Sequence, residues 1–199
     1  MPKKIYYFYG AFNENWRKLK HIQFIKGLPD PDFQFKRGSL VIIDDLMAEC
    51  SNNPFITDLF TKMSHHMNLS IVLVSHNLFC PGKEFRTISL NCHYFILFKN
   101  VRDTFQISLL GRQMYGAGSK DFLSQVYKSA TNRLHGYLCI DFRAITPDKE
   151  RLRTNVLKSD GPIIYYAEKK PKRPHQDTLS LACKSKENKK QKTSIKKSE

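Results

Sequence analysis

The chain has 199 residues, a formal net charge of +15 and a sequence pI of about 9.6. This length fits one domain with a tail, and so basic a protein is expected to bind an acidic polymer such as nucleic acid. No apolar run reaches bilayer-spanning length and no signal-peptide core follows the N-terminus, so we expect a soluble, intracellular protein without a membrane partner. Five scattered cysteines without a Cys-x-x-Cys pair predict reduced thiols.

The first half of the chain alternates strand-like and helix-like segments. Strands are predicted over Lys4–Tyr9, His21–Ile25, Leu40–Asp45 and Leu69–Ser75, with helices over residues 11–20 and 53–63. The longer of these helices begins with Asn53 as its N-cap and Pro54 in its first position. The apolar run before Asp44 is typical of a strand that is buried on both faces of a parallel sheet.

The second half continues the alternation. Strands are predicted over residues 93–98 and 136–142, and two helices between them, over residues 100–114 and 119–130. This order favours a three-layer α/β domain, with a parallel sheet and helices on both faces, from residue 1 to about residue 160.

Beyond residue 160 the composition becomes polar and basic. Residues 168–199 hold 11 Lys and Arg against 4 Asp and Glu. Such a segment buries too little apolar surface to offset its ordering entropy, so we expect residues 161–199 to be a disordered tail. Its basic motif is typical of a nuclear localisation signal or a DNA-phosphate contact, and comprises Lys169, Lys170, Lys172 and Arg173.

Polar side chains follow two of the predicted buried strands. Asp44 and Asp45 end one strand, and the triplet Ser75-His76-Asn77 ends the next. Both ends of a parallel βαβ unit emerge at the same edge of the sheet, where such sheets bind ligands. One interpretation is that the two acids bind Mg²⁺ that carries nucleotide phosphates. The alternative is that they form an acidic turn that caps the next helix.

Ten segments in a fixed order carry a resemblance to a known family. They are Gly27–Pro29, Leu40–Met47, Ser64–His66, Asn68–Ser70, Ser75–Phe79, Ile88–Asn91, Leu97–Asp103, Arg112–Tyr115, His135–Leu138 and Leu152–Asn155. Together they resemble the FtsK/HerA-like DNA-packaging ATPases, in particular the genome-packaging ATPases of large DNA viruses and of Polinton (Maverick) elements. The resemblance covers about residues 5–157.

The resemblance implies a RecA/ASCE-like P-loop NTPase core in a ring-shaped homo-oligomer that hydrolyses ATP and moves double-stranded DNA. Asp44 would then be the Walker B ligand of Mg²⁺, Asp45 the catalytic acid and His76 the sensor of the γ-phosphate. Ser75 and Asn77 would lie beside the bound nucleotide.

Three positions depart from this family pattern. The sequence has no Gly-x-x-x-x-Gly-Lys-Ser/Thr loop to hold the β-phosphate and complete the Mg²⁺ shell. The sensor position holds His76 where the family usually has Gln. Met67 stands where the family often has Arg, so an arginine that acts on a neighbouring subunit would be Arg86 or Arg102.

Two functions remain open from the sequence. The first is the C-terminal part of a DNA-translocating ATPase that lacks its first strand and phosphate loop and is inactive unless another segment or chain supplies that loop. The second is a non-catalytic, basic DNA-binding relic of a viral or mobile-element ATPase. The expected location is the nucleus, a viral factory or virion, or the cytoplasm. An empty sheet position would also leave an apolar edge for a partner to fill.

Overall fold

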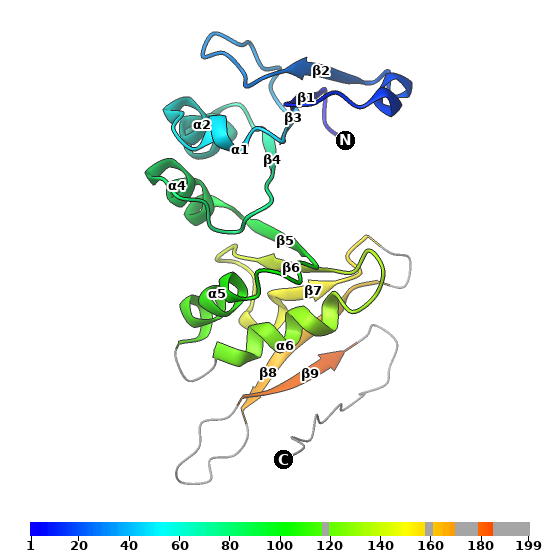
Figure 1. The fold of residues 1–199 in the computed structure, drawn as a ribbon, viewed down its shortest axis with the longest axis vertical. Coiled ribbons are helices and arrows are strands. Elements are labelled where there is room, and N and C mark those ends of the chain that lie inside the picture. Colours follow the sequence, from blue (N-terminus) through cyan, green and yellow to red (C-terminus); the bar gives the residue numbers. More distant parts are fainter. Residues whose placement is uncertain (117–119, 158–160, 170–178, 185–199) are drawn as a thin grey trace. The chain divides into compact units, whose positions relative to one another are not determined.

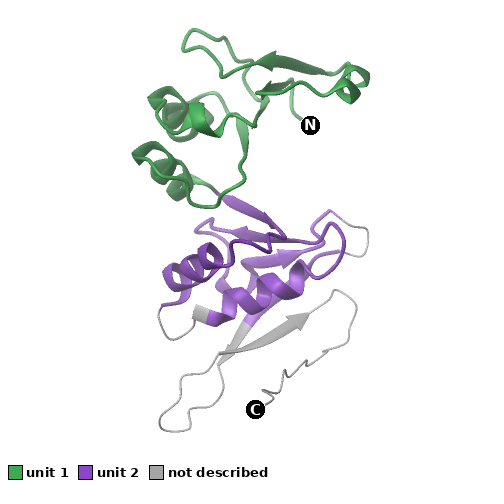
Figure 2. Cartoon of the chain, viewed as in Figure 1, with its two compact units in different colours: residues 1–92 green, residues 93–199 purple. Residues whose placement is uncertain are grey.

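The computed structural model describes residues 1–116, 120–157, 161–169 and 179–184. The chain divides into two compact units, residues 1–92 (unit 1) and residues 93–199 (unit 2), which Figure 2 shows in different colours. The division falls directly before the strand that opens the second sheet.

Unit 1 is built on a four-stranded sheet in the order β2-β1-β3-β4 (Figure 1). All three pairings in this sheet are parallel. This confirms the predicted parallel α/β sheet for the first half of the chain. The strands are β1 (Ile5–Tyr9), β2 (Ile22–Lys26), β3 (Leu40–Asp44) and β4 (Ser70–Val74).

One face of this sheet is buried under the connection between β3 and β4. Phe8, Val41 and Ile43 on this face are fully buried, together with Ile56 and Leu59 from the connection. The connection comprises helices α1 (Met47–Cys50), α2 (Pro54–Asp58), the π-helical turn η2 (Leu59–Met63) and α3 (Ser64–His66), and α4 (Lys83–Asn91) follows β4.

The predicted start of the helix after Asn53 is confirmed, because Asn53 Oδ1 accepts a hydrogen bond of 3.0 Å from the N–H of Phe55. The expected continuous helix over residues 53–63 is instead divided by the η2 turn.

The opposite face of the sheet is covered at its β1–β2 side by the 3₁₀ helix η1 (Glu14–Lys18). The Trp16 ring of η1 stacks on Phe24 with ring centroids 5.2 Å apart and also packs against Tyr7 and Tyr9. The expected helix over residues 11–20 is therefore a short 3₁₀ segment that an aromatic cluster holds to the sheet.

Unit 2 contains a second, antiparallel sheet in the order β5-β6-β7-β8-β9. The expectation that the strands after residue 92 extend a parallel sheet is wrong. The described elements of unit 2 are β5 (Tyr94–Phe98), α5 (Phe105–Tyr115), α6 (Lys120–Ala130), β6 (Tyr137–Asp141), the 3₁₀ turn η4 (Asp148–Glu150), β7 (Leu152–Thr154), β8 (Ile163–Lys169) and β9 (Leu179–Lys184).

The expected disordered tail also needs correction, since two of its segments are strands. β8 pairs with β7 and β9 pairs with β8. The β-branched and aromatic residues that begin Ile163–Lys169 are typical of a strand, and this one extends the sheet. Lys170, Lys172 and Arg173 lie outside the described residues, as do residues 185–199.

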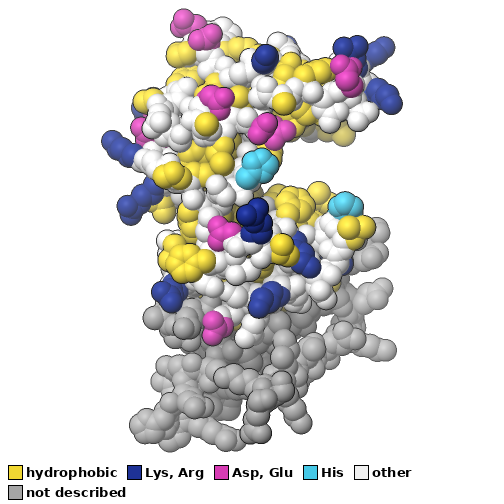
Figure 3. All heavy atoms as spheres, in the orientation of Figure 1, with side chains coloured by type: hydrophobic (Ala, Val, Ile, Leu, Met, Phe, Trp, Pro, Cys, Tyr) yellow, Lys and Arg dark blue, Asp and Glu magenta, His cyan; other side chains and the backbone are white. Residues whose placement is uncertain are grey.

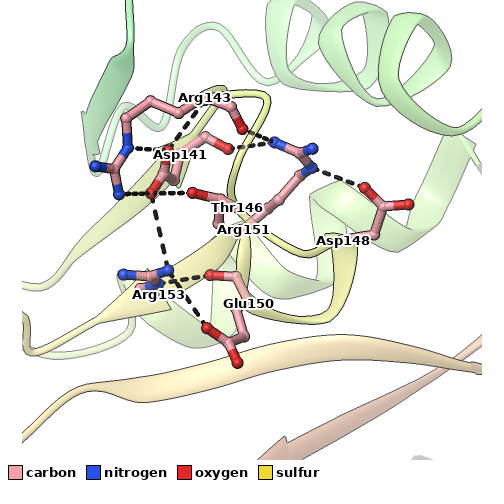
Figure 4. Close-up of polar contacts among 7 residues, drawn as sticks. All are labelled: Asp141, Arg143, Thr146, Asp148, Glu150, Arg151 and Arg153. Atoms are coloured by element: carbon pink, nitrogen blue, oxygen red, sulfur yellow. Dashed lines mark hydrogen bonds and ion pairs between the residues drawn. The ribbon is translucent and has the colours of Figure 1, made fainter.

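A buried carboxylate organises the connection between β6 and β7 (Figure 4). Asp141, whose side chain is 1% exposed, accepts hydrogen bonds from Arg143 Nε (3.0 Å) and Nη2 (2.8 Å) and from Thr146 Oγ1 (2.9 Å). Arg151 Nη1 donates to the backbone oxygens of Asp141 and Arg143, each at 3.0 Å. The guanidinium of Arg143 holds the pKa of Asp141 well below its usual range, against the opposing effect of burial. The network fixes the end of β6 rather than presenting a free carboxylate.

Candidate functional site

The carboxyl ends of β3 and β4 lie side by side because the two strands pair in parallel register, with Asp44 opposite Val74. Asp45 follows β3 directly and His76 follows β4 by two residues. Asp45 Oδ1 lies 3.8 Å from His76 Nε2. The side chains of Asp45 and His76 are 60% and 81% exposed, so a ligand can reach both.

Asp44 lies in a more enclosed position than Asp45. It is half-buried, and its Oδ2 accepts a hydrogen bond of 2.6 Å from the hydroxyl of Tyr7 on β1. Burial, this hydrogen bond and the charge of Asp44 raise the pKa of Tyr7 above its ordinary value. The Tyr7 hydroxyl therefore stays protonated near neutral pH and orients one carboxylate oxygen of Asp44.

The backbone of Asp45 is in the left-handed region, with φ of 57°. Asp is among the few residues other than Gly that enter this region at modest cost. Gly10, at the end of β1, makes room for it: the Gly10 N–H donates to the backbone oxygen of Asp44 at 3.2 Å, and a Cβ on Gly10 would lie 2.5 Å from the Asp45 carbonyl oxygen. No side chain other than hydrogen fits at residue 10 without moving Asp45.

The segment after β4 is shaped by Ser75. Its hydroxyl donates to the backbone oxygen of Asn77 at 2.6 Å and accepts from the Asn77 N–H at 3.2 Å. The same Oγ lies 2.9 Å from Met47 Sδ. The Ser75 hydroxyl therefore stabilises the turn that presents His76, while the side chain of Asn77 is exposed.

The remaining predicted site residues lie on other elements of the chain. Arg86 is exposed on α4, and Arg102 is exposed after β5 in unit 2, where its N–H donates to Asn100 Oδ1. Lys169 is the last residue of β8. On the face of unit 1 that Figure 3 displays, Lys and Arg side chains lie at several separate places rather than in one patch.

Tyr7 and Gly10 are site residues that the sequence analysis missed. Each was assigned only to a strand or to its end. Tyr7 could not be recognised from the sequence, because its contact with Asp44 arises only when β1 pairs with β3. Gly10 could not be recognised without knowing that β1 lies beside β3.

The carboxylates of Asp44 and Asp45 suit a metal ion whose other ligands come from the phosphates of a bound substrate. In the described part of the chain, no group of three or more His, Cys, Asp or Glu side chains is placed to hold a metal. Mg²⁺ is commonly bound through one or two carboxylates together with substrate phosphates, and Asp44 and Asp45 can supply such carboxylates. The sequence contains no phosphate-binding loop beside them.

Two of the described thiols, Cys50 and Cys92, are poorly suited to nucleophilic chemistry. Burial raises the pKa of Cys50 to about 12 and that of Cys92 to about 11, so both are protonated at neutral pH. Among the described cysteines, Cys50, Cys80, Cys92 and Cys139 are all free.

Comparison with protein-family models, with curated proteins and with solved structures gives no match for this chain. Among the helices that the structure describes, none combines the length and apolarity needed to cross a lipid bilayer.

Proposed function

We propose that this chain belongs to an ATPase that acts on double-stranded DNA, and that unit 1 forms the carboxylate part of its Mg²⁺·ATP site. One observation carries the proposal. Asp44 and Asp45 end one parallel strand, and the turn that holds His76 follows the strand beside it, with Asp45 and His76 3.8 Å apart. Crevices at the carboxyl ends of parallel strands are the usual ligand sites of α/β sheets. This arrangement fits a P-loop NTPase of the RecA/ASCE type, one that moves or packages DNA.

The roles follow from the surroundings of each group. Asp44, oriented by Tyr7, would hold the Mg²⁺ that accompanies ATP, and this ion would neutralise charge on the phosphate oxygens. Asp45 is exposed and acts as the base that accepts a proton from the attacking water. His76, 3.8 Å from Asp45, would contact the γ-phosphate of a bound nucleotide, and Ser75 holds the turn that positions it.

Hydrolysis needs a group that the sequence does not supply. Without a Gly-rich loop and its Lys, no backbone cradle binds the β- and γ-phosphates. We therefore expect the 199-residue chain to bind Mg²⁺·nucleotide without turning it over, unless a partner chain contributes the loop. ATP turnover by the purified chain that disappears in Asp44→Ala would contradict this expectation.

Equilibrium binding of a fluorescent ATP analogue to the full chain tests the proposal. Binding should require Mg²⁺ and should weaken in both Asp44→Asn and Asp45→Asn. The control is Asp58→Asn, which removes an acid on α2 that pairs with Lys62 at 2.7 Å. Binding that is unaffected by EDTA, or that is equal in all three variants and the parent chain, would overturn the nucleotide site.

The charge of the chain supports a second candidate, a DNA-binding protein without catalysis. The net charge of +15 favours sequence-independent attraction to the phosphate backbone, whether or not a nucleotide binds. The two candidates differ in one measurable property, since only the ATPase requires Asp44 and Asp45.

A further inference from the structure

The two carboxylates at the end of β3 differ in how firmly their side chains are held. Asp44 is half-buried, and its Oδ2 accepts the 2.6 Å hydrogen bond from the Tyr7 hydroxyl. Among the described residues no second group bonds to this carboxylate, so Oδ1 is left for a ligand. The Asp45 side chain is 60% exposed, and its 3.8 Å distance from His76 is too long for a hydrogen bond. Of the two carboxylates, Asp44 therefore has the more defined orientation.

The Tyr7 hydroxyl is itself held toward Asp44 by its neighbours. The Tyr7 ring packs against Trp16 of η1 and Phe24 of β2, with ring centroids 4.8 and 5.3 Å away. These contacts lie within unit 1, as does the pairing of β1 with β3 that brings Tyr7 beside Asp44. The aromatic cluster therefore fixes the donor, and the donor fixes the carboxylate.

The number of oxygens that a carboxylate offers helps to distinguish Mg²⁺ from Ca²⁺. Mg²⁺ requires a nearly ideal octahedron with bonds of about 2.0–2.1 Å, which a carboxylate enters through one oxygen. Ca²⁺ takes about six to eight oxygen ligands at about 2.3–2.6 Å, and one carboxylate can supply two of them. A carboxylate that is restricted to one oxygen therefore favours Mg²⁺.

We infer that Tyr7 is a positioning residue that makes Asp44 a ligand through Oδ1 alone and so sets a preference of the site for Mg²⁺ over Ca²⁺. Binding through both oxygens would compete with the 2.6 Å hydrogen bond to Oδ2. Loss of a group that hydrogen-bonds to a metal ligand typically changes metal affinity by about 10- to 100-fold. The inference rests on the proposed function, because Tyr7 can act on the metal ion only if Asp44 binds it.

A purely structural role for the Tyr7 hydroxyl is the competing explanation. A half-buried hydroxyl needs a hydrogen-bond acceptor, and Asp44 Oδ2 supplies one whether or not a metal ion binds. The two explanations predict different results. Loss of a structural contact would weaken the binding of both ions alike, whereas loss of the positioning effect would change the ratio of their affinities.

The test compares Tyr7→Phe with the parent in the full chain. The substitution removes the hydroxyl and keeps the ring that packs against Trp16 and Phe24. The affinity for a fluorescent ATP analogue is measured with Mg²⁺ and again with Ca²⁺. The parent should bind the Mg²⁺ complex more tightly, and the ratio of the two affinities should fall at least about tenfold in Tyr7→Phe.

Tyr9→Phe is the matched control, because it removes a hydroxyl from the same strand. Tyr9 lies two residues beyond Tyr7 on the same face of β1, and its ring packs against Phe12 and Trp16. The hydrogen bond to Asp44 comes from Tyr7 and not from Tyr9, so the Mg²⁺ to Ca²⁺ ratio of the control should equal that of the parent. Trp16 fluorescence checks that both variants are folded.

Infrared spectroscopy of the Ca²⁺·nucleotide complex measures the ligation itself. The spacing of the two carboxylate stretching bands differs between binding through one oxygen and binding through two. The bands of Asp44 are identified as those that are lost in Asp44→Asn. They should indicate one-oxygen binding in the parent and two-oxygen binding in Tyr7→Phe.

An unchanged affinity ratio in Tyr7→Phe, or two-oxygen binding by Asp44 in the parent, would overturn the inference and leave the nucleotide site standing. An equal fall of the ratio in Tyr9→Phe would also overturn it, since the effect would then belong to the aromatic cluster as a whole. A parent chain that binds the nucleotide without any need for Mg²⁺ would overturn the proposed function, and this inference with it.

Discussion

At the scale of single residues, the position of Asp45 depends on a hydrogen atom of Gly10. The Asp45 carbonyl approaches Gly10 so closely that no Cβ fits between them, and Asp45 has a left-handed backbone at the same point. Backbone strain of this kind is retained only where the surroundings hold it in place. Gly10 therefore links the end of β1 to the geometry of the carboxylate pair.

We expect Gly10→Ala to destabilise unit 1 by about 1–3 kcal/mol, because the new methyl group must displace the Asp45 backbone. Urea unfolding followed by Trp16 fluorescence measures this cost, and the NMR signals of Asp45 should shift.

The control is Gly27→Ala. Gly27 has φ of 82°, but a Cβ added to it would meet no atom within 4 Å. The Gly27→Ala variant therefore measures the cost of a left-handed backbone alone, without a steric clash. Equal costs for the two variants, with Asp45 signals unmoved, would contradict the role given to Gly10.

The sequence identified those site residues whose polar side chains interrupt an apolar run. The carboxylates and His76 were recognisable as polar groups at the ends of apolar runs, and the structure brings Asp45 and His76 together. Tyr7 was assigned only to a strand, because its contact with Asp44 crosses 37 positions of the chain. The hydroxyl of Ser75, which is predicted to lie beside the nucleotide, also donates to the backbone oxygen of Asn77 in its own turn.

At the scale of secondary structure elements, the four strands of unit 1 were predicted within one or two residues. Their apolar runs and bounding Gly and Pro residues are strong local signals. The second sheet was predicted wrongly in orientation. When one helix connects two strands, the chain returns to the starting end of the first strand, and the second strand runs parallel to the first. When two consecutive antiparallel helices connect them, the second strand runs antiparallel to the first. The sequence had shown two helices between β5 and β6, so this error was avoidable.

The end of β6 gives a prediction on pH. The pKa of Asp141 is depressed in the folded state, so its contribution to stability is complete above the unfolded pKa of about 3.9 and is lost as the pH falls below it. Asp141→Asn should lower the free energy of unfolding near pH 7 by roughly 1–3 kcal/mol, because the buried side chain loses charge-assisted hydrogen bonds from Arg143 and Thr146. It should also reduce the loss of stability between about pH 5 and pH 2, within the range set by these pKa values.

Urea unfolding followed by circular dichroism measures both effects. Asp148→Asn is the matched control, since Asp148 is 90% exposed in its pair with Arg151 and should contribute at most about 1 kcal/mol. Similar acid sensitivity in Asp141→Asn and the parent chain would show that this carboxylate does not govern the pH response.

At the scale of the whole molecule, the net charge of +15 predicts electrostatic binding to DNA. Binding to duplex DNA should be independent of sequence and should fall steeply with salt, as counterions are released from the phosphates. The β9 strand lies within residues 168–199 and pairs with β8, so deleting this segment would remove part of the sheet. Substitution is therefore the better test of its charges.

Replacing the four cations of the basic motif with Gln should reduce the slope of log K against log salt by up to about 3–4. These residues are Lys169, Lys170, Lys172 and Arg173. The control removes the same charge at Lys189, Lys190, Lys192 and Lys196. Equal changes would assign the effect to net charge alone, and an affinity that does not vary with salt would exclude the DNA interaction.

The most direct test of the carboxylate site uses Mn²⁺ in place of Mg²⁺, because Mn²⁺ broadens the NMR signals of nearby nuclei. With Mn²⁺·ATP added to the full chain, the amide signals of Gly10, Asp45, Leu46 and His76 should broaden selectively, and Asp44→Asn should abolish the effect. Selective broadening elsewhere in the chain, or the same broadening in Asp44→Asn, would contradict a nucleotide site at the carboxyl edge of β3 and β4.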